Sequence, residues 1–351
     1  MTNSNLSINI LYRNARTFIT MKYKLLGNTG VKVSELCLGT MTFGGPCDDK
    51  ESSIIFKNCR DSGINFFDCA NVYEGGSSEK ILGKLISGSR NEVVITTKVY
   101  SPTGKDINAR GNTRKHIKHA LEDSLRRLKT DYIDLYFLHR FDDLTPLQET
   151  LNTLEDLIKE GKILYIGASN FAAWQVTKAL GISYLNNWNR IECIQPMYNL
   201  VKRQAEVEIL PMAKSENIGV ITYSPLGGGL LTGKYSKNKK LENGRLIENK
   251  MYTERYRNPI YFETAKKFID LAEGYGLSPI SLAVAWVGSN PAVTAPIIGA
   301  RSYEQLKPAL KSLSIDITNE LRAEISALSP QPPLATDRND ELTEFNLMQR
   351  R

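Results

Sequence analysis

The sequence lacks long apolar runs and any organised cysteine pattern. No stretch approaches the roughly 18–20 consecutive apolar residues of a membrane-spanning helix, so no membrane association is predicted. The five cysteines are odd in number and scattered, with no Cys-x-x-Cys pair. Three of them lie in or beside strand-like segments, where a free cysteine acts as a small buried residue. This usage favours a reducing, cytoplasmic compartment over a disulfide-stabilised fold.

Histidine is also scarce, with three residues in 351. His116 and His119 stand three apart in a helical segment without a third ligand, so we expect a solvated helix face and no metal site. Lysine and arginine exceed aspartate and glutamate by 45 − 38 = 7, which suits nucleic acid, an acidic surface or an anionic small molecule. The one dense basic run, residues 237–240, is typical of a solvated loop, and nucleic-acid binding is not predicted.

The two ends of the chain differ from its middle. Residues 1–20 are rich in Asn, Ser and Thr and carry Arg13 and Arg16, but no Asp or Glu. This composition fits either a transit peptide or a flexible extension before a functional start at Met21. Residues 329–351 form a polar tail, so we assign the folded domain to residues 21–328.

Between the ends, short apolar segments alternate with amphipathic ones. Helix signals mark the amphipathic segments: Thr113 caps residues 114–128, and Gly63 follows residues 49–61. Further helices are expected from residue 77 and at residues 146–160, 172–180, 204–216, 261–274, 280–287 and 303–310. The strand candidates are apolar throughout, as in a sheet covered on both faces; they span residues 36–38, 64–67, 93–97, 133–138, 163–168, 191–195, 220–223 and 295–298. Eight such units predict an α/β fold, a closed (β/α)8 TIM barrel.

Three segments decorate the predicted barrel. Gly27-Asn28-Thr29-Gly30 predicts an N-terminal β-hairpin, residues 227–259 an insertion after a strand, and residues 319–328 an extra C-terminal helix. Two phosphate-binding alternatives fail. The turn after the first barrel strand lacks the Gly-x-Gly-x-x-Gly of a doubly wound sheet. Residues 228–234 keep P-loop spacing, but Tyr235 replaces the Ser or Thr that binds Mg²⁺.

Four polar residues mark consecutive strand ends of this barrel. Asp68, Lys98 and His139 each follow directly on a predicted strand, and Tyr73 lies five residues beyond Asp68. Because the C-terminal ends of barrel strands converge on one mouth, we expect the four side chains to be neighbours.

These residue types suit proton transfer. A free tyrosine titrates at about 10, and the ammonium of Lys98 should lower the pKa of Tyr73 by favouring the phenolate. Asp68 can be the counter-ion that keeps Lys98 charged. His139 can donate a hydrogen bond to a substrate oxygen or transfer a proton. A structural ion pair beside a core histidine is the alternative, but it does not account for all four positions.

The chain resembles the aldo-keto reductase superfamily, in the branch related to potassium-channel β-subunits and bacterial aldo-keto reductases. The resemblance runs from about residue 21 to residue 328. It is carried by Gly39-Thr40-Met41-Thr42-Phe43-Gly44, Phe67-Asp68-Cys69-Ala70-Asn71-Val72-Tyr73, Ser78-Glu79-Lys80-Ile81-Leu82-Gly83, Thr97-Lys98, Asp131-Tyr132-Ile133-Asp134-Leu135-Tyr136-Phe137-Leu138-His139, Gly161-Lys162-Ile163-Leu164-Tyr165-Ile166-Gly167-Ala168-Ser169-Asn170, Gln195-Pro196-Met197-Tyr198-Asn199-Leu200 and Tyr223-Ser224-Pro225-Leu226-Gly227.

The resemblance implies reversible hydride transfer between a nicotinamide dinucleotide and an aldehyde or ketone. Tyr73 would be the general acid, with Lys98 and Asp68 as its tuning pair, and His139 would orient the carbonyl. Arg301 stands where the family binds the 2′-phosphate, which implies NADPH/NADP+ as the cofactor, and a guanidinium suits a phosphate.

The resemblance also assigns the remaining cofactor contacts. Ser169, Asn170 and Gln195 would hold the nicotinamide amide, and Tyr223 would lie under its ring. Arg245, in the insertion at residues 227–259, would close over the pyrophosphate or be a solvated loop residue. The turn after Tyr223 would meet phosphate through backbone N–H groups and Lys234. The other expected contacts are Gly39, Thr40, Met41, Asp68, Ser224, Pro225, Leu226, Gly228, Gly299, Ala300 and Gln305.

The chain departs from the family at the adenine site, where Pro308 and Ala309 replace an acidic residue and an Asn, and adenine binding should weaken. Phe43, Tyr100 and Trp174 either wall the substrate pocket or serve packing. The sequence specifies neither the physiological carbonyl substrate nor the oligomeric state. A second function stays open, a regulatory subunit that senses nicotinamide redox state with slow turnover.

Overall fold

The computed structural model describes residues 21–235, 244–338, 340 and 343; residues 1–20 and the basic run at residues 237–240 lie outside them. Eight parallel strands form a closed barrel in the order β10-β3-β4-β5-β6-β7-β8-β9, so the predicted (β/α)8 barrel is confirmed. The strands are β3 (Cys37–Gly39), β4 (Phe66–Asp68), β5 (Val94–Val99), β6 (Ile133–Leu138), β7 (Ile163–Ser169), β8 (Ile191–Gln195), β9 (Gly219–Thr222) and β10 (Ala295–Ile298).

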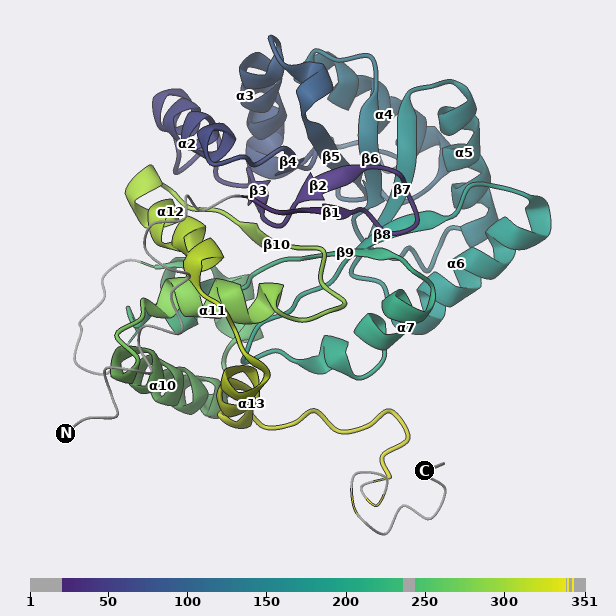
Figure 1. Ribbon diagram of the computed structural model, residues 1–351. Helices are drawn as coiled ribbons and strands as arrows, with labels where there is room; N and C mark the ends of the chain where they lie inside the picture. The colour runs from purple at the N-terminus through teal and green to yellow at the C-terminus, as the bar shows by residue number, and fades with distance from the viewer. Residues whose placement is uncertain (1–20, 236–243, 339, 341–342, 344–351) are drawn as a thin grey trace, which may run out of the picture.

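Helices surround the barrel (Figure 1). They begin where the sequence offers caps: Asp48 accepts a hydrogen bond from the backbone N–H of Glu51, and Thr113 from that of His116. The helices are α2 (Asp49–Asp61), α3 (Ser77–Ile86), α4 (Arg114–Leu128), α5 (Leu147–Lys159), α6 (Ala173–Asn186), α7 (Ile209–Ser215), α10 (Pro259–Gly274), α11 (Pro279–Gly288), α12 (Tyr303–Leu310) and α13 (Asn319–Ala327).

Two helix predictions were wrong in extent. The helix expected at residues 204–216 is a 3₁₀ turn, Gln204–Glu206, followed by the separate helix α7. Pro211 explains the break, because a proline is tolerated in the first turn of a helix but not in the interior of a longer one. Helix α6 continues past residue 180 and ends before Asn187, whose φ of 54° is left-handed, a common way to end a helix.

The predicted N-terminal hairpin, β1 (Tyr23–Leu25) paired with β2 (Lys32–Ser34), closes one end of the barrel. Leu26 and Val33 pack into the cluster that fills the barrel interior, with Phe66, Leu135, Phe137 and Ile221 among its members. The hairpin turn approaches the backbone so closely that a Cβ at Gly27 would lie 2.5 Å from the N atom of Gly219. The open mouth is therefore at the opposite end, where the strands finish.

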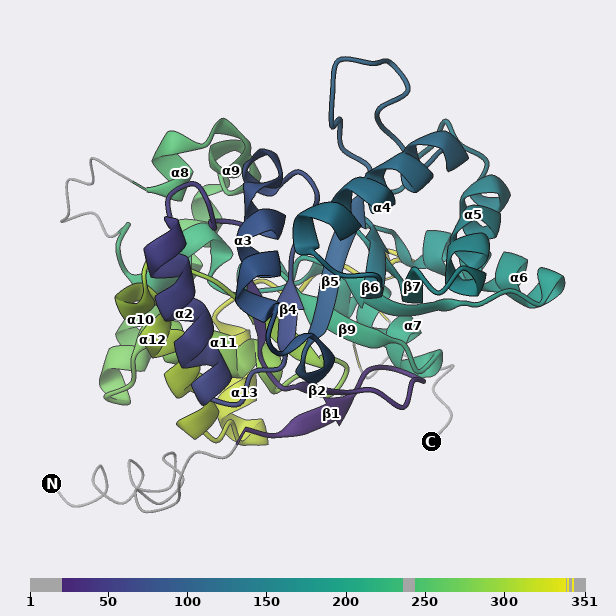
Figure 2. The same ribbon diagram turned by 90° about the horizontal axis from the view of Figure 1, so that it is seen from above.

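The insertion after β9 is helical at its second half. Helices α8 (Arg245–Glu248) and α9 (Lys250–Arg255) form a strap over the mouth side of the molecule, away from the β1–β2 hairpin (Figure 2). The extra C-terminal helix α13 is fastened by Arg322, whose guanidinium donates to the carbonyl oxygen of Trp286 at 2.7 Å. Among the described residues, no helix has the length and apolarity to cross a membrane.

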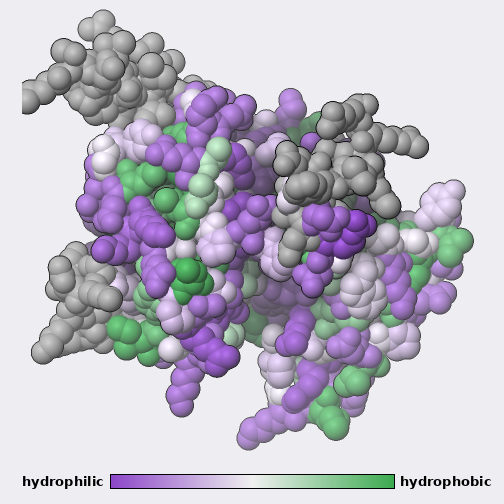
Figure 3. Space-filling view, turned by 90° about the horizontal axis from the view of Figure 1, so that it is seen from below, coloured by the Kyte–Doolittle hydropathy of each residue, from purple (hydrophilic) through white to green (hydrophobic). Residues whose placement is uncertain are grey.

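The surface is mixed in character. On the face seen in Figure 3, the described hydrophobic residues are dispersed among hydrophilic ones. Such a distribution is ordinary for a protein surface.

Candidate active site

The four strand-end residues meet at the mouth of the barrel. Asp68 is the last residue of β4, Lys98 is the penultimate residue of β5, and His139 follows β6. Tyr73 opens a short 3₁₀ turn, Tyr73–Gly76, after β4. These strands are direct neighbours in the parallel ladder, which places the ends of all three on the same side.

Lys98 is the centre of the site. Its ammonium donates to Asp68 Oδ2 at 2.7 Å, to the carbonyl oxygen of Cys69 at 2.6 Å and to the Tyr73 hydroxyl at 3.2 Å. All three ammonium donors are therefore used. The Lys98 side chain is fully buried, and a buried charge persists only where it is paired and hydrogen-bonded.

Asp68 is equally well satisfied. Its second oxygen, Oδ1, accepts from Thr96 Oγ1 at 2.7 Å and from Gln195 Nε2 at 2.8 Å. Gln195 ends β8, so this carboxylate joins two sides of the barrel. The bonds hold Asp68 in one orientation against Lys98.

His139 completes the cluster. Its ring lies edge-on to the Tyr73 ring, with 6.1 Å between centroids. Its Nδ1 is buried without a hydrogen-bond partner among the described residues. The structure thus brings all four side chains together at the mouth of the barrel.

The pKa of Tyr73 differs from the sequence-based expectation. Burial raises it to about 12, and this effect exceeds the opposing effect of the Lys98 charge. The expected net lowering was therefore wrong for the free protein. Burial also disfavours the ammonium, but Asp68 and Tyr73 more than offset this and raise the pKa of Lys98. The pair is thus a neutral phenol beside a charged lysine.

Burial, aided by the Lys98 charge, lowers the pKa of His139 from 6.5 to about 3. The imidazole is therefore neutral at neutral pH. It can donate one N–H, but it does not add positive charge to the site.

Acidification should reveal the low pKa of His139. The folded pKa lies below the unfolded value, so the unfolded chain takes up the proton first, and stability is lost as the pH falls from 6.5 toward 3. Between pH 6.5 and 4.5, the free energy of unfolding of His139→Asn should fall by about 1–2 kcal/mol less than that of the wild type, since His139 is partly exposed. Urea unfolding at each pH measures this. His119→Asn on the exposed face of α4 is the control, and equal losses in His139→Asn and wild type would contradict the prediction.

The residues expected near a nicotinamide adjoin this cluster. Asn170 Nδ2 donates to the carbonyl oxygen of His139 at 2.9 Å and to Ser169 Oγ at 3.0 Å, while its Oδ1 accepts from the Tyr223 hydroxyl at 2.7 Å. Ser169 Oγ donates to the carbonyl oxygen of Gln195 at 3.0 Å. One hydrogen-bonded network therefore links the ends of β6, β7 and β8 to Tyr223.

Other expected contacts are engaged within the protein. The Thr40 hydroxyl donates to the carbonyl oxygen of Asp68, and Ser78 Oγ donates to the backbone and the hydroxyl of Thr40. Thr40 follows Gly39 at the end of β3, and it serves the turn there. Met41 is 36% exposed.

The turn after β9 has a left-handed backbone. Ser224, Gly228 and Gly229 have φ values of 58°, 67° and 96°. A Cβ at Gly228 would lie 3.1 Å from the Tyr252 ring, and one at Gly229 would lie 2.8 Å from Lys234 Nζ. The turn thus brings backbone and a lysine close together, as a phosphate site requires.

Part of that turn is already satisfied. The N–H groups of Gly227, Gly229 and Leu231 donate to carbonyl oxygens of Ser224 and Leu226. These three N–H groups are therefore not available to a phosphate, although the sequence predicts that backbone N–H groups of this turn meet one. Pro225 is buried and Leu226 is partly buried against the core.

Comparison with known proteins decides the family. The model of the Aldo/keto reductase family matches residues 35–330. The chain belongs to the aldo/keto reductase family. It is 39% identical to the "Uncharacterized oxidoreductase YrpG" of Bacillus subtilis, over 89% of this chain and 97% of that protein.

Two further relatives cover similar lengths. The "Aldo-keto reductase YhdN" of Bacillus subtilis is 34% identical over 88% of this chain and 93% of its own. A "Probable voltage-gated potassium channel subunit beta" of Oryza sativa is 36% identical over 90% of this chain and 99% of its own. As an aldo/keto reductase, this protein is an oxidoreductase, and the family generally uses nicotinamide cofactors.

At the end of β10, this aldo/keto reductase holds Arg301 in an ion pair. Arg301 Nη2 lies 2.8 Å from Glu248 Oε2 at the end of α8, and its backbone N–H donates to Gln305 Oε1 at 3.3 Å. The neighbouring carbonyl oxygen of Ala300, after Gly299, accepts from the Thr42 hydroxyl at 2.7 Å. Sequence reasoning did not foresee that Arg301 has a carboxylate partner.

Helix α12 explains the two residues that depart from the family at the position expected to bind adenine. Ala309 is 3% exposed and faces the core. The carbonyl oxygen of Pro308 accepts from Ser281 Oγ at 2.7 Å. Both positions therefore serve the packing of α12 against α11, while Gln305 is exposed.

Arg255 lies beside the expected cofactor residues but was not predicted from the sequence. The guanidinium carbons of Arg245 and Arg255 lie 5.0 and 4.8 Å from the centroid of the buried Tyr252 ring. Neither arginine has a carboxylate partner among the described residues. Arg255 also lies close enough to Tyr223 to affect its pKa, against the larger raising effect of burial. No local motif distinguishes Arg255 from the other charges of the strap.

Two guanidinium groups that no carboxylate of the described residues pairs with fit a polyanionic ligand. Both guanidinium groups lie against the ring of Tyr252, and this ring packs against Gly228 in the turn after β9. A stacked guanidinium keeps its in-plane N–H donors free for phosphate oxygens. The residues present at the mouth therefore fit a dinucleotide.

One of the two histidines expected to be solvated is buried. His116 is 2% exposed, and its Nε2 has no hydrogen-bond partner among the described residues. It lies one turn before Ala120 on the buried side of α4, whereas His119 is exposed. The three-residue spacing does not distinguish the two faces.

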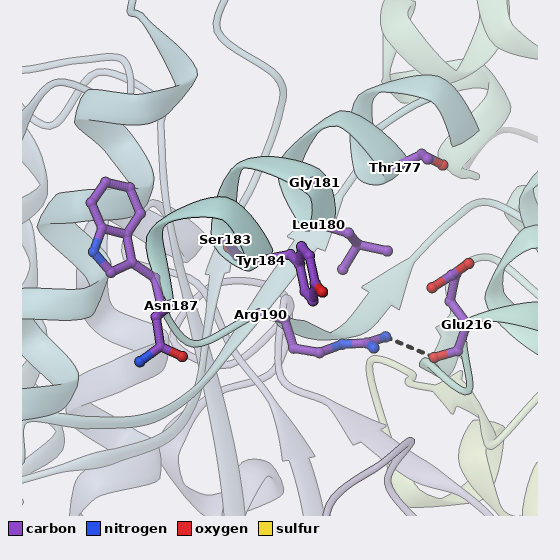
Figure 4. Close-up of a pocket in the computed structure, with 9 residues that line it drawn as sticks. Thr177, Leu180, Gly181, Ser183, Tyr184, Asn187, Arg190 and Glu216 are labelled. Atoms are coloured by element: carbon purple, nitrogen blue, oxygen red, sulfur yellow. Dashed lines mark hydrogen bonds between the residues drawn. The ribbon is translucent and has the colours of Figure 1, made fainter.

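Cavities also occur along α6, outside the mouth. One, of about 510 Å³, lies between α6 and Arg190, whose guanidinium donates to the carbonyl oxygen of Glu216 at 2.7 Å (Figure 4). Arg190 precedes β8, so this cavity is at the opposite end of that strand from Gln195. A second, of about 560 Å³, is lined by Trp174 and Met212. The first cavity is separate from the candidate active site.

Proposed function

We propose that this aldo/keto reductase reduces aldehydes or ketones with NADPH, and that Tyr73 is the proton donor. One observation carries the proposal, the buried Lys98 ammonium that bridges Asp68 and the Tyr73 hydroxyl. A bound nicotinamide cofactor supplies the hydride. The residues of the chain orient the carbonyl and hold the proton.

The proton is held on Tyr73 until it is needed. Burial keeps the phenol protonated, and an alkoxide that develops on the substrate is far more basic than a phenolate. The phenolate left after transfer lies 3.2 Å from Lys98 Nζ. Lys98 therefore stabilises the charge that appears during the reaction, which is the charge that matters for the rate.

Asp68 and His139 support that transfer. Asp68 keeps Lys98 charged and in place. His139 is neutral, so it orients the carbonyl oxygen by donating a hydrogen bond and does not compete with Tyr73 as an acid. This division of roles follows because burial raises the pKa of Tyr73 and lowers that of His139.

The groups that would hold the cofactor extend from the four strand-end residues to β10. The amide of Gln195 lies beside the Asp68 carboxylate, and that of Asn170 lies beside Ser169. The Tyr223 hydroxyl donates to the Asn170 amide oxygen. Arg245, Arg255 and Lys234 would bind the phosphates, and Arg301 the 2′-phosphate. Arg301 supports NADPH over NADH as the reductant.

The test is oxidation of NADPH by the purified protein with 4-nitrobenzaldehyde and with methylglyoxal. We expect turnover that depends on the aldehyde and is slower with NADH. The change in NADPH absorbance measures it. A protein that binds NADPH but reduces neither aldehyde contradicts the proposed reaction.

A second function is supported by the relatives named as channel subunits in Oryza sativa and Arabidopsis thaliana. In that function the barrel reports nicotinamide redox state to a partner and turns over slowly. Stopped-flow measurement distinguishes the two. Cofactor release much slower than hydride transfer, with a partner that stays bound during purification, favours the regulatory role.

A further inference from the structure

The Arg301–Glu248 ion pair connects two parts of the mouth that are far apart in sequence. Arg301 follows β10, and Glu248 ends α8 in the strap; their charged atoms are 2.8 Å apart, and both side chains are 41% exposed. The guanidinium proposed for a 2′-phosphate is thus already bound to an anion of the same chain.

The strap holds Glu248 in place. The Leu246 N–H donates to the Tyr235 hydroxyl at 3.0 Å, and the Thr253 hydroxyl donates to the carbonyl oxygen of Leu246 at 2.6 Å. Leu246 and Tyr252 also pack against Gly228. Glu248 therefore lies on a segment that is fixed to the turn after β9. Its ion pair with Arg301 connects this segment to the turn after β10.

A second carboxylate lies near Arg301. Glu51 of α2 accepts a hydrogen bond of 2.6 Å from the backbone N–H of Tyr303, the first residue of α12. A helix N-terminus is a natural position for a phosphate, and here a carboxylate takes it. Both anions near Arg301 therefore oppose a phosphate at this position.

We infer that Glu248 is a cofactor-specificity residue, which competes with the 2′-phosphate of NADP for Arg301 and so reduces the preference for NADP over NAD. The inference rests on the proposed function. A phosphate that carries close to two negative charges repels a carboxylate at hydrogen-bond distance, so NADP must displace Glu248. NAD has a 2′-hydroxyl instead, which can donate a hydrogen bond to a carboxylate.

Calorimetric titration of the full chain with NADP+ and with NAD+ tests this without relying on turnover. Glu248→Gln removes one charge of an exposed ion pair. It should tighten the binding of NADP+ by about three- to tenfold. It should not tighten NAD+. In an Arg301→Leu background, Glu248→Gln should tighten NADP+ binding by less than it does in the wild type, because competition for Arg301 is gone and only direct repulsion remains.

Glu254→Gln is the matched control. It removes the ion pair with Arg257, 2.9 Å long and also exposed, from the neighbouring helix α9, and both affinities should stay within twofold. Equal changes for the two dinucleotides in Glu248→Gln, or none, overturn the inference and leave the proposed function intact. A wild-type protein that binds neither dinucleotide overturns both.

Discussion

Tyr73→Phe should lower the turnover number for aldehyde reduction by about 10²–10⁴-fold, the usual contribution of a positioned general acid. The variant removes only the hydroxyl that lies 3.2 Å from Lys98 Nζ. The ring remains against His139, so the pocket keeps its shape. Steady-state kinetics with NADPH and 4-nitrobenzaldehyde measures the effect, which should fall on kcat far more than on KM.

Tyr136→Phe is the control for this experiment. Tyr136 is a fully buried tyrosine in β6 whose hydroxyl has no hydrogen-bond partner among the described residues, and its loss should leave turnover within about twofold. NADP+ should bind Tyr73→Phe as it binds the wild type. If Tyr73→Phe keeps wild-type turnover, Tyr73 is not the proton donor.

Asp68→Asn should destabilise the fold by about 3–5 kcal/mol, because it leaves the charge of Lys98 buried without its counter-ion. The wild-type pair is 2.7 Å apart, with both side chains almost fully buried. Urea unfolding at neutral pH measures the change. Adding Lys98→Met to Asp68→Asn should restore much of the lost stability, since the unpaired ammonium is then gone.

An exposed pair gives the comparison. Lys84 and Asp49 lie 3.0 Å apart with side chains 60% and 66% exposed, and Asp49→Asn should cost less than about 1 kcal/mol. Because the folded pKa of Lys98 is raised above 10.5, its stabilising contribution is present below pH 10.5 and is lost as the pH rises through the folded value. A cost for Asp68→Asn as small as that for Asp49→Asn would mean that Lys98 is not charged in the fold.

Much of the barrel follows from local pattern. Strands β6, β8 and β10 and helices α2, α4 and α12 have the bounds that the sequence predicts, because apolar runs, caps and glycines define them locally. Helix α7 shows the limit of that approach. Its apolar positions suit a longer helix, and the break depends on where Pro211 can be accommodated.

The candidate site divides in the same way. Asp68, Tyr73, Lys98 and His139 could be named from their places at strand ends. The net pKa of Tyr73 could not, since burial and the Lys98 charge oppose each other and only the packed site shows which is larger. Arg255 and Glu248 could not be singled out either, because the strap that carries them has no motif.

The sequence by itself determined the barrel, the four residues at its mouth and the resemblance to reductases, because each depends on patterns over short stretches of chain. Beyond the Lys98–Asp68 pair, which the strand ends predict, the tertiary structure decided which charges are paired and which are not. Lys98 meets Asp68 and Arg301 meets Glu248 across 30 and 53 residues, while Arg245 and Arg255 remain without a carboxylate partner among the described residues. Pairing and burial are set by distance in space, and segments distant along the chain are brought within that distance only when strands and loops come together in the fold.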